Sequence, residues 1–400
     1  DFLFPKIYNL SKAITLSKNQ IRTLTEINFS SLNYDNVYHP PEYCILYDQF
    51  PESDVYSFSL IAYQLITNEK PFEKVNYDTI EQICTNNLRP KFSDSVPESY
   101  RKLIEKCWAT DPAKRPTFDE IVYHLKTDPE FITENVNKEE FESYVNFMDK
   151  AQTCNNSKQI DDFLKTNNQT FHKVKIDFNK YKNPAKLNFS VNLGSIDLNK
   201  YEKLKKIGSG GFGSVYEIKE KETQVIYAAK ISIYEVDQCS NDVIINLSRE
   251  IDIISKLNHP SILKFIGFSS RNFKNKQKPT IISEYAPNFS LDKIIENERL
   301  GIGNHEWNDT KKLINIYGIA SGMAYLHSLD ILHRDLKPAN ILLDNFLYPK
   351  IADFGLSKTI FEEDKRELYR EKKVITSGFK GTYAYCAPEI IFKQKYTKAG

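Results

Sequence analysis

The chain has few cysteines, and they are not spaced for a metal site or a disulfide framework. Six cysteines stand among 400 residues, without a C-x-x-C pair or a histidine neighbour at zinc-ligand spacing. Zinc-binding modules and small secreted domains depend on such spacing. The sequence therefore argues against structural zinc and disulfides and favours a reducing compartment, so we expect a cytoplasmic protein.

A strong charge of one sign and a long apolar run are also missing. The formal net charge is +1, which creates no extended basic field for nucleic acid or an anionic membrane. The longest apolar-rich run, residues 56–66, is too short to span a bilayer and is typical of a buried helix. We therefore expect no nucleic acid partner and no membrane segment in this sequence.

An internal repeat organises what is present. Three segments near the start each have a counterpart near the end, and the pairs are 1–7 with 344–351, 10–14 with 356–360, and 38–42 with 385–389. Because most of the chain separates the members of each pair, the period is one domain plus a linker rather than a solenoid repeat. We therefore expect the chain to begin and end at nearly corresponding places in two successive copies.

The second copy carries oxygen-bearing side chains on two neighbouring loops. The segment HRDLKPAN occupies 333–340, and DFG occupies 353–355. Asp335 is suited to orient an attacking hydroxyl group, while Asn340 and Asp353 offer the hard oxygen ligands that Mg²⁺ prefers. Phosphoryl transfer needs these parts, and a solvated polar turn does not account for both segments at this spacing.

These segments resemble the catalytic loop and metal-binding motif of eukaryotic protein kinases, and Lys337 beside Asp335 resembles the Ser/Thr type. The resemblance implies an α+β, two-lobed fold with a β-rich N-lobe and a mainly helical C-lobe. It also implies ATP and Mg²⁺ as cofactors, with proteins as substrates. By resemblance the catalytic residues are Asp335, Lys337, Asn340, Lys230 and Glu250, and the metal ligands are Asn340 and Asp353.

The region from residue 201 carries the expected nucleotide contacts. Strand-like runs flank a glycine-rich loop on both sides, which favours a hairpin tip over the helix-opening loop of dinucleotide-binding proteins. By resemblance, Lys230 contacts phosphates and pairs with Glu250, and the hinge at Glu284 and Ala286 binds adenine. The predicted nucleotide-binding residues are Ile207, Gly208, Ser209, Gly210, Gly211, Phe212, Gly213, Val215, Ala228, Lys230, Glu284, Ala286 and Asp353.

The first copy lacks a counterpart of Asp353. Only Tyr8 and Asn9 stand where the second copy has its metal-binding motif. Without that carboxylate the transferring phosphate is poorly stabilised, so this copy resembles a pseudokinase, unless the gene sequence contains an error. Its end, residues 107–118, is similar to the closing signature of tyrosine-kinase-like kinases, in which Arg115 would pair with Glu42.

We therefore predict three parts: a C-terminal lobe fragment of a degenerate copy (1–126), a linker (127–195) and a truncated kinase domain (196–400). The linker is expected to be a spacer or tether with one candidate amphipathic helix at 139–150. In this family an aspartate at the position of Asp54 holds the catalytic loop. Either the chain is a fragment of a longer tandem protein, or 54–126 docks onto 196–400 and completes its lobe.

The leading functional hypothesis is phosphoryl transfer from ATP to protein Ser/Thr hydroxyls by the second copy. Arg334 beside Asp335 suggests activation by a phosphate on the following loop, with Thr376 and Ser377 as candidates by position. The alternative is a pseudokinase scaffold that regulates a partner kinase, including intramolecular regulation between the copies. A dinucleotide-dependent enzyme is disfavoured because no helix is expected after the glycine-rich loop.

Overall fold

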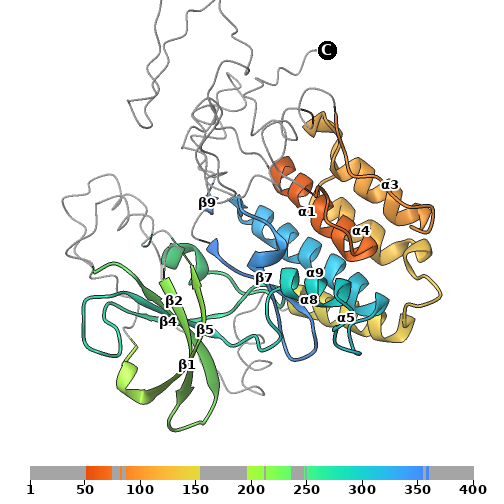
Figure 1. Ribbon diagram of the computed structural model, residues 1–400. Coiled ribbons are helices and arrows are strands. Elements are labelled where there is room, and N and C mark those ends of the chain that lie inside the picture. The colour runs from red at the N-terminus through yellow and green to blue at the C-terminus, as the bar shows by residue number, and fades with distance from the viewer. Residues whose placement is uncertain are drawn as a thin grey trace, which may run out of the picture. The chain divides into compact units, whose positions relative to one another are not determined.

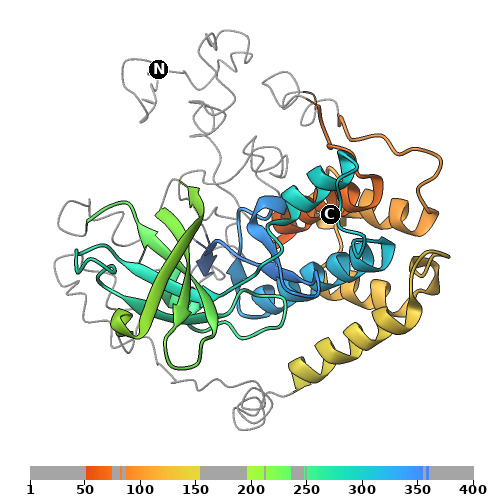
Figure 2. The same cartoon turned by 60° about the horizontal axis from the view of Figure 1, so that its bottom comes forward.

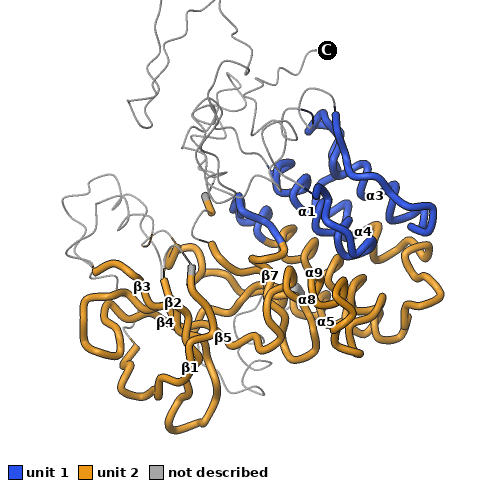
Figure 3. The backbone as a smooth tube through the Cα atoms, in the orientation of Figure 1, with its two compact units in different colours: residues 1–123, 326–337, 358–400 blue, residues 124–325, 338–357 orange. Residues whose placement is uncertain are grey.

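Two compact units make up the fold (Figure 3). The computed structural model describes residues 51–73, 82, 87–153, 196–210, 213–235, 247, 250–354 and 357–359. Unit 1 comprises residues 1–123, 326–337 and 358–400, and unit 2 comprises 124–325 and 338–357. Unit 1 therefore joins segments that belong to different predicted copies.

The centre of unit 1 is helix α1 (Pro51–Thr67). Every residue from Ser53 to Leu65 is buried, which confirms the fully buried helix expected over this run. Helix α1 packs against α3 (Glu98–Cys107), and the short helix η5 (Pro112–Lys114) leads to α4 (Phe118–Thr127). A short antiparallel pair, β6 (Ile331–Leu332) with β9 (Lys358–Thr359), also belongs to this unit.

Arg115 ties the loop before α4 to the start of α1. Its side chain is buried, and it donates hydrogen bonds to the carbonyl oxygens of Ala109 (2.8 Å) and Glu52 (3.0 Å). Its predicted partner, Glu42, lies outside the described residues, so that pairing stays a prediction. The described contacts give Arg115 a structural role.

Unit 2 contains a five-stranded antiparallel sheet with the order β1-β2-β3-β5-β4. Its strands are β1 (Tyr201–Gly210), β2 (Gly213–Glu220), β3 (Ile226–Ser232), β4 (Phe265–Ser269) and β5 (Thr280–Glu284). Along β3, Tyr227, Ala229 and Ile231 are buried while their neighbours are partly exposed, as expected for a sheet with one face on a core. The sheet confirms the predicted β-rich N-lobe.

The rest of unit 2 is mainly helical, which confirms the predicted two-lobed fold class. Its helices are α5 (Lys138–Thr153), α8 (Leu291–Arg299), α9 (Asp309–Ser328) and the short η6 (Pro129–Phe131), η9 (Leu198–Lys200) and η11 (Pro338–Asn340). The last three residues of α9 count with unit 1 and the last four of α4 with unit 2. A hairpin of β7 (Ile341–Leu343) and β8 (Pro349–Ile351) follows η11.

Helix α5 lies alongside α9 (Figures 1 and 2). Phe141 of α5 packs edge to face on Tyr317 of α9, with ring centroids 5.7 Å apart. The helix falls inside the segment that we predicted to be a linker, and it covers the candidate helix at 139–150. Its apolar face explains why this part of the segment packs against a core. Among the described residues, no helix is long and apolar enough to cross a membrane.

His259 is a buried histidine that burial keeps neutral. Only 7% of its surface is exposed, its Nδ1 accepts the Ser261 N–H (3.1 Å), and its ring stacks on Tyr325. Burial, together with the positive charge of Lys350, lowers the pKa of His259 to about 3. In mild acid, His259 therefore binds a proton in the unfolded chain but not in the folded protein.

Lowering the pH from about 7.5 to about 5.5 should decrease the free energy of unfolding by about 1 kcal/mol through His259 alone. An unfolded histidine has a pKa of about 6.5, so this contribution is present above that pH and is lost as the pH falls toward the folded value. Urea denaturation at both pH values measures the effect. His259→Gln should flatten the pH dependence and the exposed His305→Gln should not; an unchanged slope in His259→Gln would refute the assignment.

Candidate active site

The predicted phosphate-contacting lysine is held by two carboxylates in unit 2. Lys230 Nζ, on β3, lies 2.8 Å from Glu250 Oε1 and 3.6 Å from Asp353 Oδ1. Burial alone would lower the pKa of Lys230, but the charges of Glu250 and Asp353 outweigh it and raise the pKa to about 12. The ammonium group is therefore positively charged at any physiological pH.

The two predicted metal ligands lie at the same end of the β7–β8 hairpin. Ile341 pairs with Ile351, and the Ala352 N–H donates to the Asn340 carbonyl oxygen over 2.8 Å. Asp353 follows directly with a backbone φ of 60°, a left-handed conformation that costs about 1 kcal/mol or more in a non-glycine residue. The hairpin register thus sets the positions of both side chains.

This arrangement suits Mg²⁺ better than an all-protein metal cage. Among the described residues, no group of three or more His, Cys, Asp or Glu side chains could hold a metal ion. Mg²⁺ is commonly bound through one or two side-chain oxygens, with water and substrate phosphates completing its shell. Asn340, Asp353 and the neighbouring Lys230 fit a Mg²⁺-bound phosphate ester.

The predicted catalytic loop, in unit 1, is organised around two buried side chains. His333 is fully buried, and its Nδ1 accepts the backbone N–H of Asp335 over 3.3 Å. The Asp335 carboxylate is mostly buried and pairs with Lys337, with 2.8 Å between Nζ and Oδ2. Arg334 between them has a φ of 71°, so the loop backbone is strained at that residue.

Asp54 of α1 stabilises this strained backbone. Its Oδ2 accepts the N–H of His333 and its Oδ1 accepts the N–H of Arg334, each over 3.0 Å. Burial alone would raise the pKa of Asp54, but the hydrogen bond from His327, the charges of His327 and His333, and the Arg334 N–H together lower it. Asp54 is far from the loop in sequence but forms hydrogen bonds with it in the fold, as the alternative in which 54–126 docks onto 196–400 requires.

His327 is a site residue that sequence reasoning did not assign. Its Nε2 lies 3.1 Å from Asp54 Oδ2, and because a carboxylate only accepts, this nitrogen carries the donated proton. Phe118 at the start of α4 packs edge to face on the same imidazole, with ring centroids 5.1 Å apart. The sequence offered no signal for this role beyond the position of His327 near the end of α9.

The glycine-rich segment is a hairpin tip, as predicted. Gly208 pairs with Val215 and Gly210 with Gly213 across β1 and β2. A side chain at Gly213 would bring its Cβ to 2.5 Å from the Ile231 carbonyl oxygen, so this position requires glycine. Gly211 and Phe212 lie outside the described residues, as do Thr376 and Ser377.

The predicted hinge residues lie at and just after the end of β5. The Glu284 side chain accepts the Lys264 N–H (2.8 Å) and lies 3.5 Å from Lys350 Nζ, so it helps to hold this edge of the sheet. Ala286 follows two residues later and is partly buried. Adenine binding by the backbone of this segment stays a prediction.

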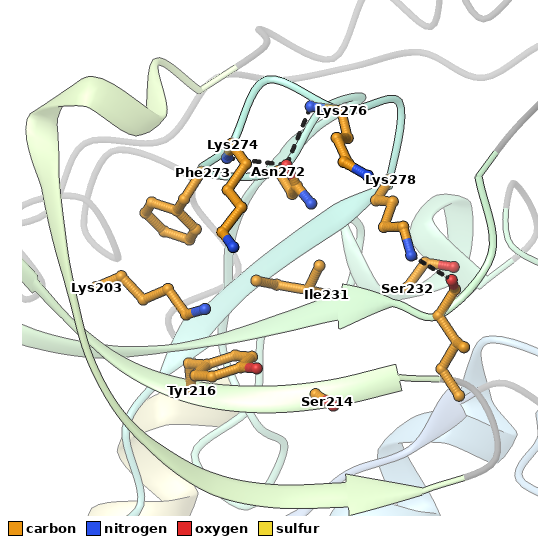
Figure 4. A pocket seen from close by; sticks show the side chains of 11 residues that line it. Lys203, Ser214, Tyr216, Ile231, Ser232, Asn272, Phe273, Lys274, Lys276 and Lys278 are labelled. Atoms are coloured by element: carbon orange, nitrogen blue, oxygen red, sulfur yellow. Dashed lines mark hydrogen bonds between the residues drawn. The ribbon is translucent and has the colours of Figure 1, made fainter.

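A pocket of about 370 Å³ lies between strands β1–β3 and the turn that joins β4 to β5 (Figure 4). Four lysines line it, but Lys203 lies over the Tyr216 ring, Lys276 faces Glu235 at 3.6 Å, and Lys278 donates to the Ile233 carbonyl oxygen. None of the predicted nucleotide residues lines it, because its lining residues Ser214, Tyr216 and Ile231 alternate with Val215 and Lys230 along β2 and β3 and so face the other side of the sheet. The pocket is therefore not the nucleotide site.

Comparison with known proteins agrees with this geometry. The protein kinase domain family model matches residues 201–400, and the protein tyrosine and serine/threonine kinase model matches residues 16–125. Dual specificity protein kinase pyk3 of Dictyostelium discoideum is 28% identical over 367 residues, which cover 88% of this chain and 24% of that protein. It is thus similar to the chain across both matched regions.

Two further relatives match about half of the chain. Cysteine-rich receptor-like protein kinase 10 of Oryza sativa subsp. japonica is 39% identical, over 48% of this chain and 27% of its own length. Serine/threonine-protein kinase sgk-1 of Caenorhabditis elegans is 34% identical, over 50% of this chain and 39% of its own length. The chain spans less than half of each relative. With a family model that matches half of its residues, the chain belongs to the protein kinase family.

Proposed function

We propose that the chain is the catalytic part of an ATP-dependent protein serine/threonine kinase, with its active-site residues in 196–400. The contact of Lys230 with both Glu250 and Asp353 carries this proposal. It joins a phosphate-binding cation to a metal-ligating carboxylate, which is the combination that phosphoryl transfer requires. Kinases of the Ser/Thr and dual-specificity types among the relatives support it.

The resemblance to protein kinases implies a role for each side chain. Glu250 holds the Lys230 ammonium group in place, and Lys230 in turn binds phosphate oxygens of ATP. Asn340 and Asp353 would hold Mg²⁺, which when bound neutralises charge on the phosphoryl oxygens. The carboxylate of Asp335 accepts a hydrogen bond from the substrate hydroxyl and orients it for attack. Lys337 pairs with Asp335 and adds positive charge beside the carboxylate that orients the hydroxyl group.

A tandem arrangement accounts for the two family matches. Because either match covers at most half of the chain, the similarity to pyk3 over 88% of the chain must run across both in the same order. We propose that residues 1–126 belong to a degenerate copy of the tyrosine-kinase-like group that regulates the second copy. The hydrogen bonds from the catalytic loop to Asp54 supply a physical route for this regulation. A cytoplasmic location fits the scattered cysteines.

Phosphoamino acid analysis tests the proposed activity directly. The chain, incubated with γ-labelled ATP, Mg²⁺ and a mixture of protein substrates, should place the label on serine and threonine, and only when Mg²⁺ is present. Asp353→Asn should lower the rate by about 100-fold because a metal-binding charge is lost. The exposed Asp119→Asn serves as the matched control. Equal labelling by Asp353→Asn, or label on tyrosine alone, would disprove the proposal.

A further inference from the structure

Helix α5 is built into unit 2 by one apolar face. Phe141, Tyr144, Val145 and Met148 are all buried, with exposed fractions of 2%, 4%, 6% and 0%. Their spacing places them on one side of the helix. Polar contacts fix the start of the same helix, because Glu140 pairs with Lys311 at 2.5 Å and the Asn137 N–H donates to Thr310 Oγ1. The helix therefore docks at a defined place.

The Tyr144 side chain contacts two structures that lead to the candidate metal site. Its hydroxyl group lies 3.1 Å from Ser261 Oγ, in the segment that runs from the helical residues 250–254 to β4. Its ring packs on Tyr348, in the turn between β7 and β8, with centroids 4.6 Å apart. One side chain thus connects the segment after Glu250 with the hairpin that carries Asn340 and Asp353.

Backbone hydrogen bonds continue from Ser261 to the metal ligands. The Ser261 carbonyl oxygen accepts the N–H of Ile351 over 2.7 Å, and the Ile351 carbonyl oxygen accepts the N–H of Leu263 over 2.9 Å. Ser261 and Leu263 therefore flank the last residue of β8. Asp353 stands two residues beyond Ile351, so the position of Ser261 sets where the metal-binding end of the hairpin lies.

Gly318 of helix α9 leaves space for the Tyr144 side chain. A side chain at Gly318 would collide with the Tyr144 hydroxyl group, and its Cβ would lie 2.6 Å from Pro349 Cγ and 3.1 Å from Ser261 Oγ. The absence of a side chain at Gly318 lets α5, β8 and the Ser261 segment meet at one place. The Tyr144 hydroxyl group makes the polar contact at this place, with Ser261 Oγ.

We propose that Tyr144 of α5 is a positioning residue, which acts through Ser261 and Tyr348 to hold Asn340 and Asp353 in their metal-binding positions. The segment between the two family matches then helps to support the active-site residues of the second match, 201–400. This inference rests on the proposed function only in that Asn340 and Asp353 bind Mg²⁺ together with a nucleotide. Tyr144 acts on Asn340 and Asp353 only through Ser261 and Tyr348.

Nucleotide binding by the full chain, with and without Mg²⁺, tests this role. Tyr144→Phe keeps the ring and removes the hydroxyl group, so it should raise the Kd for ATP in Mg²⁺ by about three- to tenfold. In EDTA the Kd should stay within about twofold, because Lys230 and Glu250 do not depend on the metal. Ser261→Ala should produce the same change, and the double variant should lose no more than either single variant.

Tyr123→Phe is the matched control, because this tyrosine of α4 is 64% exposed and its substitution should leave both Kd values unchanged. Equal changes of Kd with and without Mg²⁺, no change in either, or additive effects of the two variants would overturn the inference. Binding requires no phosphoryl transfer. A chain that binds Mg²⁺ and ATP as described but labels no protein would refute the proposed function and leave this inference standing.

Discussion

Replacing Asp335 with asparagine should lower kcat for phosphoryl transfer by about 10²- to 10⁴-fold. The amide keeps the shape of the side chain but removes the charge that accepts the hydrogen bond from the attacking hydroxyl group. It also removes the ion pair with Lys337. The Kd for ATP should stay within about twofold, because the predicted phosphate and metal contacts are made by other residues. Initial rates at saturating ATP, together with equilibrium ATP binding, measure the two effects separately.

The exposed Asp94→Asn is the control for this substitution, and it should match the wild-type protein in both assays. A kcat for Asp335→Asn within a factor of a few of the wild-type value would show that another group orients the substrate. A loss confined to ATP binding would instead place Asp335 among the nucleotide contacts.

Replacing Asp54 with alanine should decrease the free energy of unfolding by about 3 to 5 kcal/mol. The change leaves the N–H groups of His333 and Arg334 buried without their acceptor and removes the partner of His327. Because Arg334 is held in a left-handed conformation, the loop should relax and phosphoryl transfer should fall to background. Urea denaturation measures the stability, and the labelling assay measures the activity.

Asp54→Asn separates charge from shape, because the amide retains one oxygen acceptor but not two. It should lose less stability than Asp54→Ala. Because the folded protein lowers the pKa of Asp54, the charge contributes stability above about pH 4 that is lost as the pH falls further. The acid side of the stability profile should therefore be shallower in both variants. A wild-type acid profile in Asp54→Ala would contradict the assigned interactions.

The sequence alone predicted those contacts of the site for which a family motif specifies both partners. The resemblance to protein kinases predicts that Glu250 pairs with Lys230, and their contact at 2.8 Å confirms the pairing. The strands around the glycine-rich loop predict a hairpin, and the pairing of Gly210 with Gly213 confirms it. Both relations depend on short-range geometry that the family motifs specify.

Other features depend on which distant surfaces meet, and no local pattern specifies that. The apolar spacing of α5 predicts a helix but does not reveal that Tyr144 meets Ser261 at Gly318. The resemblance predicted that Asp54 holds a catalytic loop, but the sequence left open whether 54–126 docks onto 196–400. His327 joins the site only because α9 ends beside Asp54.

Hydrogen exchange of the catalytic loop tests most directly whether a helix from the first family match supports the active site of the second. In the wild-type chain, the amides of residues 331–337 should be protected, and Asp54→Ala should make this segment exchange as fast as unstructured peptide. Protection of β2 at 213–220, in unit 2, should persist and exclude global unfolding. The account is contradicted if residues 331–337 exchange equally in both proteins.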